Sequence, residues 1–240
     1  MLKYTYKIKN IKDFMMHILI QRQKIVKFLV IVALILITIH SIILGIYYYV
    51  GDPDKFDFVQ MFDLDMERNI PTMFSSFILA FSALCFYLLS KESAEKAKNH
   101  QKYWLGLSGV FLFLSFDEGA KIHEKIGDFT ENFVDPTGYL HYPWVISYGI
   151  LVLILAVLYM KFFWKMPTKV FRSFMLSAFI YLSGAVGFEL LGANESSLHG
   201  TKTVLYSVLY TIEESLEMFG VILLIWILLG LLSKKKMEVQ

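Results

Sequence analysis

The stretch FLVIVALILITIHSIILGIYYYV, residues 28–50, decides the fold, because its 23 residues include no Asp, Glu, Lys or Arg. A bilayer core about 30 Å thick is crossed by roughly 20 helical residues. Two further runs of this kind occupy 70–90 and 138–160. Over the whole chain 56% of residues are hydrophobic and 18% are charged, whereas a soluble domain carries about 25% charged residues. The sequence therefore predicts an all-α integral membrane protein.

Three shorter apolar runs each end beside acidic residues, so they reach spanning length only if those acids lie in the membrane or at its boundary. Counting them, we predict a polytopic bundle of six transmembrane helices within a single membrane domain, residues 28–233. The predicted spans are 28–50, 70–90, 103–123, 140–161, 172–192 and 204–233.

Charge alternates along the chain between the spans. Lys and Arg gather in 1–27, 91–102, 161–172 and 234–236, whereas the connections at 51–69 and 128–135 are acidic. Cytoplasmic connections carry the Lys/Arg excess. We therefore expect cytoplasmic N and C termini and extracytoplasmic acidic loops, in the inner membrane of a bacterium. Residues 1–27 form a basic segment with apolar residues at helical spacing, either lying on an anionic leaflet or acting as a solvated tail, and 234–240 form a basic tail.

Several classes of site are excluded by composition. The formal charge of +2 gives no reason to expect nucleic acid, and one cysteine rules out a Cys-based metal site. No Gly-rich phosphate loop is present, which argues against a nucleotide. Retinal requires a lysine in the last span, and this span contains none. His40 and His123 lie near opposite ends of their spans, which excludes haem.

Acidic residues fall at one depth when each span is measured from its basic end. With a rise of 1.5 Å per residue, Glu118, Glu189 and Glu217 all lie about 24–25 Å along their helices. Charges in hydrocarbon cost roughly 2.5–3.5 kcal/mol each, so these acids should face one another, water or a cation. The alternative is that they mark the headgroup boundary, where acids are tolerated.

Helical spacing adds detail to this layer. Glu213 and Glu217 are four residues apart on one face, so their repulsion calls for a cation, a basic partner or a shared proton. Asp117 and Glu124 are expected to share another face, and His123 to point elsewhere on the same helix. The candidate metal ligands are Glu118, His123, Glu189, Glu213 and Glu217. The candidate supporting residues are Glu67, Asn69, Ser75, Ser115, Asp117, Glu124, Tyr206, Tyr210 and Glu214.

A histidine with several carboxylates suits zinc, iron, manganese or calcium, without distinguishing among them. Such a metal could activate water against a lipid, a small amphiphile or an amide, as in a metal-dependent intramembrane hydrolase. Two other hypotheses stay open. The acids could form a proton or ion relay of a transporter, or they could hold together a scaffold that binds a protein partner or a second copy of the chain.

Three segments, FDLDMERNIPTMFSS (62–76), FLSFDEGAKIHEKI (113–126) and EESLEMFG (213–220), resemble a recurring set in an uncharacterised family of bacterial multispan membrane proteins. That resemblance implies a membrane fold and no particular activity.

The chain also faintly resembles the alkaline ceramidase and adiponectin-receptor superfamily of membrane hydrolases. Glu67, Asn69 and Ser75 could match the acidic/Asn/Ser stretch on an early span of that superfamily, and Ser115 with His123 loosely its Ser and His. The chain departs from it in having six predicted spans rather than seven, and Glu where zinc-binding His would stand.

Overall fold

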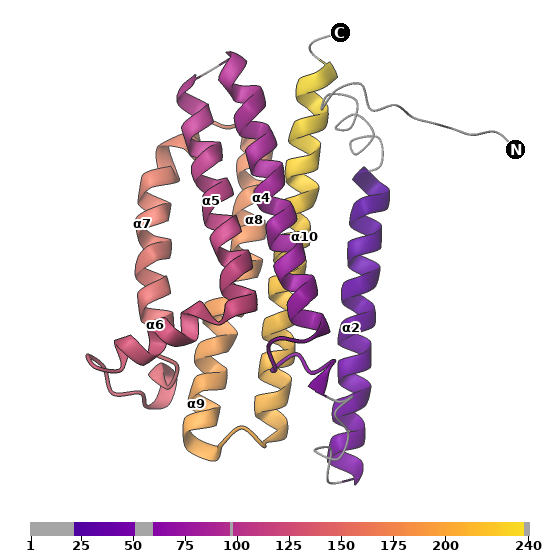
Figure 1. Ribbon diagram of the computed structural model, residues 1–240, viewed down its shortest axis with the longest axis vertical. Helices are drawn as coiled ribbons and strands as arrows, with labels where there is room; N and C mark the ends of the chain where they lie inside the picture. The colour runs from indigo at the N-terminus through magenta and orange to yellow at the C-terminus, as the bar shows by residue number, and fades with distance from the viewer. Residues whose placement is uncertain (1–21, 51–59, 97, 238–240) are drawn as a thin grey trace, which may run out of the picture.

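The computed structural model describes residues 22–50, 60–96 and 98–237, and all regular structure in this part of the chain is helical (Figure 1). The predicted segment 1–27 therefore falls mostly outside the described residues, as do the last three residues of the predicted tail. In chain order the elements are α2 (Arg22–Val50), α4 (Ile70–Lys96), α5 (Lys98–Ala120), α6 (Ile122–Thr130), the 3₁₀ turn η1 (Gly138–Leu140), α7 (Trp144–Trp164), α8 (Thr168–Leu182), the π-helical turn η2 (Ser183–Phe188), α9 (Glu189–His199) and α10 (Val204–Met237).

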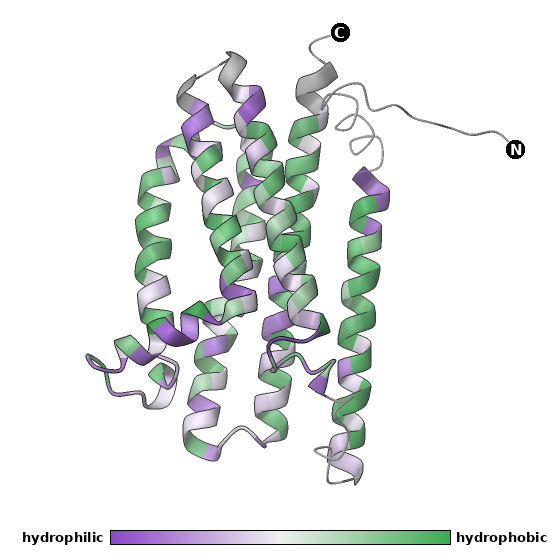
Figure 2. Ribbon diagram, viewed as in Figure 1, coloured by the Kyte–Doolittle hydropathy of each residue, from purple (hydrophilic) through white to green (hydrophobic). Residues whose placement is uncertain are grey.

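Five helical segments among the described residues are long and apolar enough to cross a membrane. They are Arg22–Tyr49, Ile70–Ser93, Trp144–Trp164, Thr168–His199 and Val204–Ser233. Apolar residues cover most of their length (Figure 2). Little of α7 is buried within the protein, and large side chains such as Leu153 and Val157 are exposed. Because such a surface suits lipid rather than water, the chain is a membrane protein.

The region of the third predicted span is α5, a 23-residue helix that packs along α4. Its composition is more polar than that of the five segments above. The helix ends at Ala120 rather than continuing to 123, because Lys121 adopts a left-handed conformation with φ 57° and redirects the chain into α6. The fifth predicted span, in contrast, continues past 192 to His199, through the π-helical turn η2.

Helix α10 occupies the centre of the bundle and packs against α2, α4 and α8. The start of α2, the end of α10 and the α4–α5 and α7–α8 connections lie at one end, whereas α6 and the α9–α10 connection lie towards the other (Figure 1). The connections at the first end are those that carry the Lys and Arg excess. The charge pattern of the sequence therefore corresponds to the two ends of the folded bundle.

The core near the basic end is apolar and tightly packed. Met218, Ile225, Leu228 and Leu229 of α10 are almost completely buried, together with Phe86 and other side chains of α4. Small residues allow α8 to approach α10, as is common between membrane helices. A Cβ at Gly220 would lie 2.8 Å from the backbone nitrogen of Tyr181.

Candidate functional site

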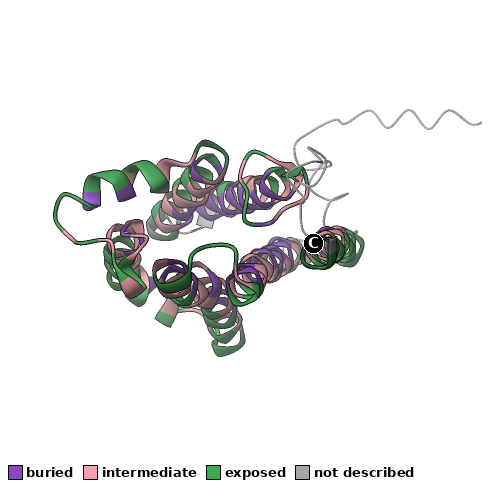
Figure 3. Ribbon diagram, turned by 90° about the horizontal axis from the view of Figure 1, so that it is seen from below, coloured by how far each residue is buried: buried purple, intermediate pink, exposed green. Residues whose placement is uncertain are grey.

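A cavity of about 1020 Å³ lies among α5, α6, α7, η2 and α10, and it reaches α6 towards the end of the bundle opposite the basic connections. Figure 3 shows the bundle viewed from that end, coloured by burial. Of the described residues that line the cavity, eleven are acidic and none is Lys or Arg. The acidic residues are Asp65, Glu67, Asp117, Glu118, Glu124, Asp128, Glu131, Glu189, Glu213, Glu214 and Glu217. The fold thus gathers into one space acids that are widely separated in the sequence.

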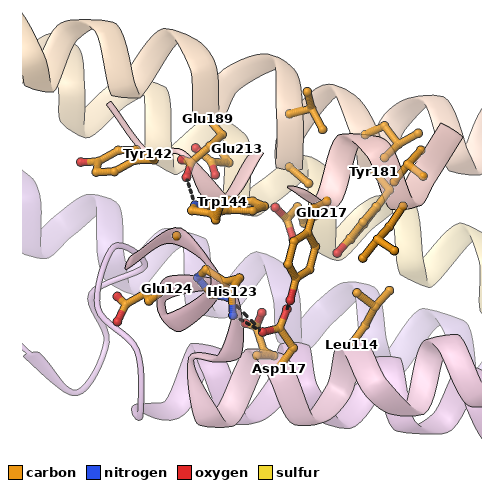
Figure 4. A pocket seen from close by; sticks show the side chains of 18 of the residues that line it. Leu114, Asp117, His123, Glu124, Tyr142, Trp144, Tyr181, Glu189, Glu213 and Glu217 are labelled. Atoms are coloured by element: carbon orange, nitrogen blue, oxygen red, sulfur yellow. Dashed lines mark hydrogen bonds and ion pairs between the residues drawn. The ribbon is translucent and has the colours of Figure 1, made fainter. Parts of the chain in front are cut away.

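Glu189, Glu213 and Glu217 line the cavity close to one another (Figure 4). The carboxyl groups of Glu189 and Glu213 interact with each other. The indole nitrogen of Trp144 donates to Glu189, at 3.0 Å, and Tyr181 lies beside Glu217. Two carboxyl groups at such close range need a proton or a cation between them.

The π-helical turn η2 brings these acids together. Glu189 begins α9 directly after the turn. Gly184 within the turn lies so close to α10 that a Cβ there would be 2.7 Å from the carbonyl oxygen of Glu213 and 3.1 Å from Cγ of Glu217. Single π-helical turns inside helices occur frequently at functional sites.

Asp117 holds His123 beside the same cavity. One Asp117 oxygen accepts the backbone N–H of His123 at 2.6 Å and lies 3.3 Å from the Nδ1 atom of its ring. The other accepts the Tyr148 hydroxyl at 2.9 Å. Glu67 lies 3.2 Å from the Nε2 atom of His123. Burial favours the neutral ring, but these hydrogen bonds and charges outweigh it and raise the pKa of His123 to about 10. His123 is therefore protonated, and each of its ring nitrogens lies beside a carboxylate.

This geometry corrects two expectations about α5 and α6. Asp117 and Glu124 do not share a helical face, because the chain turns at Lys121 between them. Nor does His123 point away from Asp117, because the same turn brings its ring back to the carboxylate. Lys121 pairs instead with Glu67 at 3.2 Å and Glu124 at 3.0 Å. Burial opposes the charge on Lys121, but these hydrogen bonds raise its pKa.

A chain of tyrosines borders the outer part of the cavity. Tyr206 donates to Asp65 at 3.0 Å, and Tyr210 donates to Asp63 at 3.4 Å. Tyr142 lies 3.3 Å from the Tyr206 hydroxyl. Burial raises the pKa of Asp65 to about 6, although the hydrogen bond from Tyr206 opposes this shift. Tyr206 and Tyr210, two of the candidate supporting residues, thus face the acids of the loop before α4.

Three predicted supporting residues lie outside the cavity lining. The Asn69 side chain accepts the backbone N–H of Thr72 at 3.1 Å and donates to two loop carbonyls, so it caps the start of α4. Ser115 donates to the carbonyl of Ser76 on α4, at 2.8 Å, and fastens α5 to α4. Ser75 is buried, and its hydroxyl has no hydrogen-bond partner within the described part of the chain.

The Asn69→Ala substitution should therefore destabilise the protein without weakening binding in the cavity. Removing an N-cap costs about 1 kcal/mol, so we expect the melting temperature to fall by a few degrees. Thermal unfolding in detergent measures this loss. Asn132→Ala, an exposed position, is the control. A selective loss of ligand binding in Asn69→Ala would show that Asn69 belongs to the site.

The residues of the cavity that sequence reasoning missed include Asp65, Trp144, Tyr148 and Tyr181. Trp144 and Tyr148 belong to α7, which carries no acidic residue. Comparing the depths of acidic residues along the spans therefore does not identify them. Their sequence signal is an aromatic pair four residues apart at the start of an apolar span, where one helical face would carry both.

No preformed metal site is present among the described residues, in the sense that no three His, Cys, Asp or Glu side chains converge as metal ligands. A family model described as "Domain of unknown function (DUF8692)" matches residues 28–231, nearly the whole described helical region. The chain belongs to the DUF8692 family. No curated protein and no solved structure matches it. The site of this DUF8692 protein must therefore be interpreted from its own geometry.

Proposed function

We propose that this protein is a cation-binding integral membrane protein of the bacterial inner membrane, with six spans and both termini in the cytoplasm. The even number of spans follows if α5, which lies alongside α4 and is 23 residues long, crosses the bilayer with it. The basic connections then face the cytoplasm, and the acidic cavity opens on the outer side, at the level of the outer leaflet.

The observation that carries the proposal is the charge balance of the cavity. Eleven acids line it without a lysine or arginine in the described lining. Lys121 and His123 neutralise only the Glu67, Asp117 and Glu124 group. Glu189, Glu213 and Glu217 lie deeper, where unpaired carboxylates are costly. A cation held there would remove that cost.

The ligands in this proposal are carboxylates. Glu118, Glu189, Glu213 and Glu217 offer oxygen atoms, which suit manganese, calcium or zinc. His123 takes a different role, since both of its ring nitrogens already face carboxylates. It holds Asp117 and Glu67 in place at the rim.

The packing of the bundle favours a protein that binds a cation without transporting it across the membrane. From the acids towards the basic end, α10 presents Met218, Ile225, Leu228 and Leu229 to a closed apolar core, and the part of the cavity that extends this way along α5 is lined by no acid. A transport pathway would need polar groups or a break along this stretch, and transporter sites usually lie near the midplane.

Isothermal titration of the purified protein with Mn²⁺, Ca²⁺ and Zn²⁺, supported by elemental analysis, tests the proposal. We expect one of these metals to bind the wild type, and Glu217→Gln to weaken its binding at least tenfold. The matched control is Glu195→Gln, because Glu195 bonds Thr203 and His199 away from the cavity. Metal at background level, or equal binding by wild type and Glu217→Gln, would overturn the metal form of the proposal.

A further inference from the structure

The half of the cavity nearer the bundle interior is apolar, and α5 forms one of its walls. Gly106, Gly109, Val110 and Phe113 line it, at the spacing that places residues on one helical face. A Cβ at Gly109 would meet no atom within 4 Å. Gly109 therefore leaves open space along this part of α5, which we call the slot.

Two other helices complete the slot. α7 contributes Leu151 and Leu155, and the α8–η2 segment contributes Leu182 and Val186. α7 packs mainly against α6 and touches α5 only slightly, which leaves the space between them open. This apolar space continues directly into the acidic part of the same cavity.

Gly106 is the lining residue of α5 nearest the basic end, and Tyr159 lies against it and donates to the carbonyl of Tyr103 at 3.2 Å. From Gly106 to Asp117 is eleven residues of α5, a distance of about 16 Å. The cavity thus has a long apolar part on one side and an acidic part on the other.

The acidic part is suited to an organic cation. Trp144 lies between His123 and Glu189 (Figure 4), and its ring centroid is 5.4 Å from that of Tyr148. Aromatic faces attract ammonium groups, and carboxylates accept their N–H groups in charge-assisted hydrogen bonds. A bare metal ion would bind to the carboxylate oxygens but would make no contact with the aromatic faces or with the slot.

From this division we infer that the cavity binds a single-chain amphiphile with a protonated amine head, the head at Glu189, Glu213 and Glu217 and the chain in the slot beside Gly109. The inference rests on the cation-binding cavity proposed above and names its cation. An anionic head would meet eleven acids. The volume of about 1020 Å³ is at the upper end of the roughly 300–1,000 Å³ of sites for small ligands.

Dodecylamine is the probe, because its amine is protonated at neutral pH as that of lysine is. Butylamine keeps the head and shortens the chain, whereas dodecanoate and dodecanol keep the chain and change the head. The protein is studied in a non-ionic detergent, with affinity taken from the rise in melting temperature and from the fluorescence of Trp144, isolated by subtracting the Trp144→Phe variant. We expect dodecylamine to bind at least tenfold more tightly than each of the other three.

Two kinds of variant separate the head site from the slot. Glu217→Gln and Gly109→Leu should each weaken dodecylamine binding at least tenfold. Gly45→Leu on α2, where a Cβ also meets nothing within 4 Å, should leave it unchanged. Leu151→Trp, at a half-exposed position on α7, narrows the slot from the opposite wall and replaces Gly109→Leu if that variant does not fold.

Metal competition distinguishes failure of this inference from failure of the proposed function. If a metal binds through Glu217 but dodecylamine neither binds nor displaces it, the inference fails and the cation site stands. If no metal binds but dodecylamine binds and depends on both Glu217 and Gly109, the metal form fails and the inference holds. Equal binding of dodecanol, equal binding of butylamine, or indifference to Gly109→Leu and Leu151→Trp would each overturn the inference.

Discussion

The Gly184→Ala substitution should lower the melting temperature by several degrees and weaken cation binding at the same time. The added Cβ would lie 2.7 Å from the carbonyl oxygen of Glu213 and 3.2 Å from Cβ of Leu216. Backbone cannot move aside as a flexible side chain does, so η2 must shift away from α10. Overpacking of this kind costs about 1–3 kcal/mol.

The loss of binding follows from the position of the displaced turn. Glu189 is the first residue after η2, and its carboxyl group interacts with that of Glu213. A shift of η2 would separate these two groups. Sub-ångström to 1 Å displacements at a site are enough to reduce its function strongly.

Gly187→Ala is the matched control for this prediction. Gly187 belongs to the same π-helical turn, but a Cβ there meets no atom within 4 Å. Differential thermal unfolding and metal or dodecylamine titration of both variants give the result. If Gly184→Ala has the same melting temperature and the same affinity for metal or dodecylamine as Gly187→Ala, the close approach of η2 to α10 does not position the acids.

The location of the acids could be predicted from the sequence, because it depends only on helical rise. Glu118, Glu189 and Glu217 were placed at one depth by counting residues, and the fold brings all three to one cavity. Apolar runs such as 28–50 likewise indicate helices, since length and hydropathy set them without reference to neighbours.

The partners of these acids could not be predicted, because they depend on local breaks in the helices. A left-handed Lys121 turns the chain so that His123 meets Asp117, and nothing in the helical period signals that turn. The π-helical turn at Gly184 changes which face of α9 carries Glu189. Asn69 is a candidate supporting residue in the sequence, whereas its side chain caps α4.

The Asp117→Asn substitution should destabilise the protein by about 3–5 kcal/mol near neutral pH and change how its stability depends on pH. Asp117 is 5% exposed and is bonded to His123 and Tyr148. Removing one partner of a buried ion pair leaves the other charge without compensation, which accounts for that magnitude. Glu67 would remain beside the ring, with Glu118 and Lys121 near it.

The sign of the pH dependence follows from the raised pKa of His123. In the folded protein this pKa is about 10, against 6.5 in an unfolded chain. The protonated ring therefore contributes stability that is fully present below about pH 6.5 and is lost as the pH rises towards 10. In Asp117→Asn the pKa of His123 should fall. The stability that this variant loses as the pH rises should therefore be smaller, and the loss should be complete at a lower pH.

Melting temperatures measured from pH 6 to pH 10 for wild type, Asp117→Asn and Asp128→Asn test this prediction. Asp128 pairs with Lys125 at the surface, where both side chains are mostly exposed, and such pairs contribute at most about 1 kcal/mol. Asp128→Asn should therefore follow the wild-type profile. Because wild type and Asp117→Asn share every other titratable group, the decisive quantity is the difference between these two proteins. That difference should shrink as the pH rises from 6.5 to 10, and a constant difference would mean that Asp117 stabilises the cavity through Tyr148 and not through a charged His123.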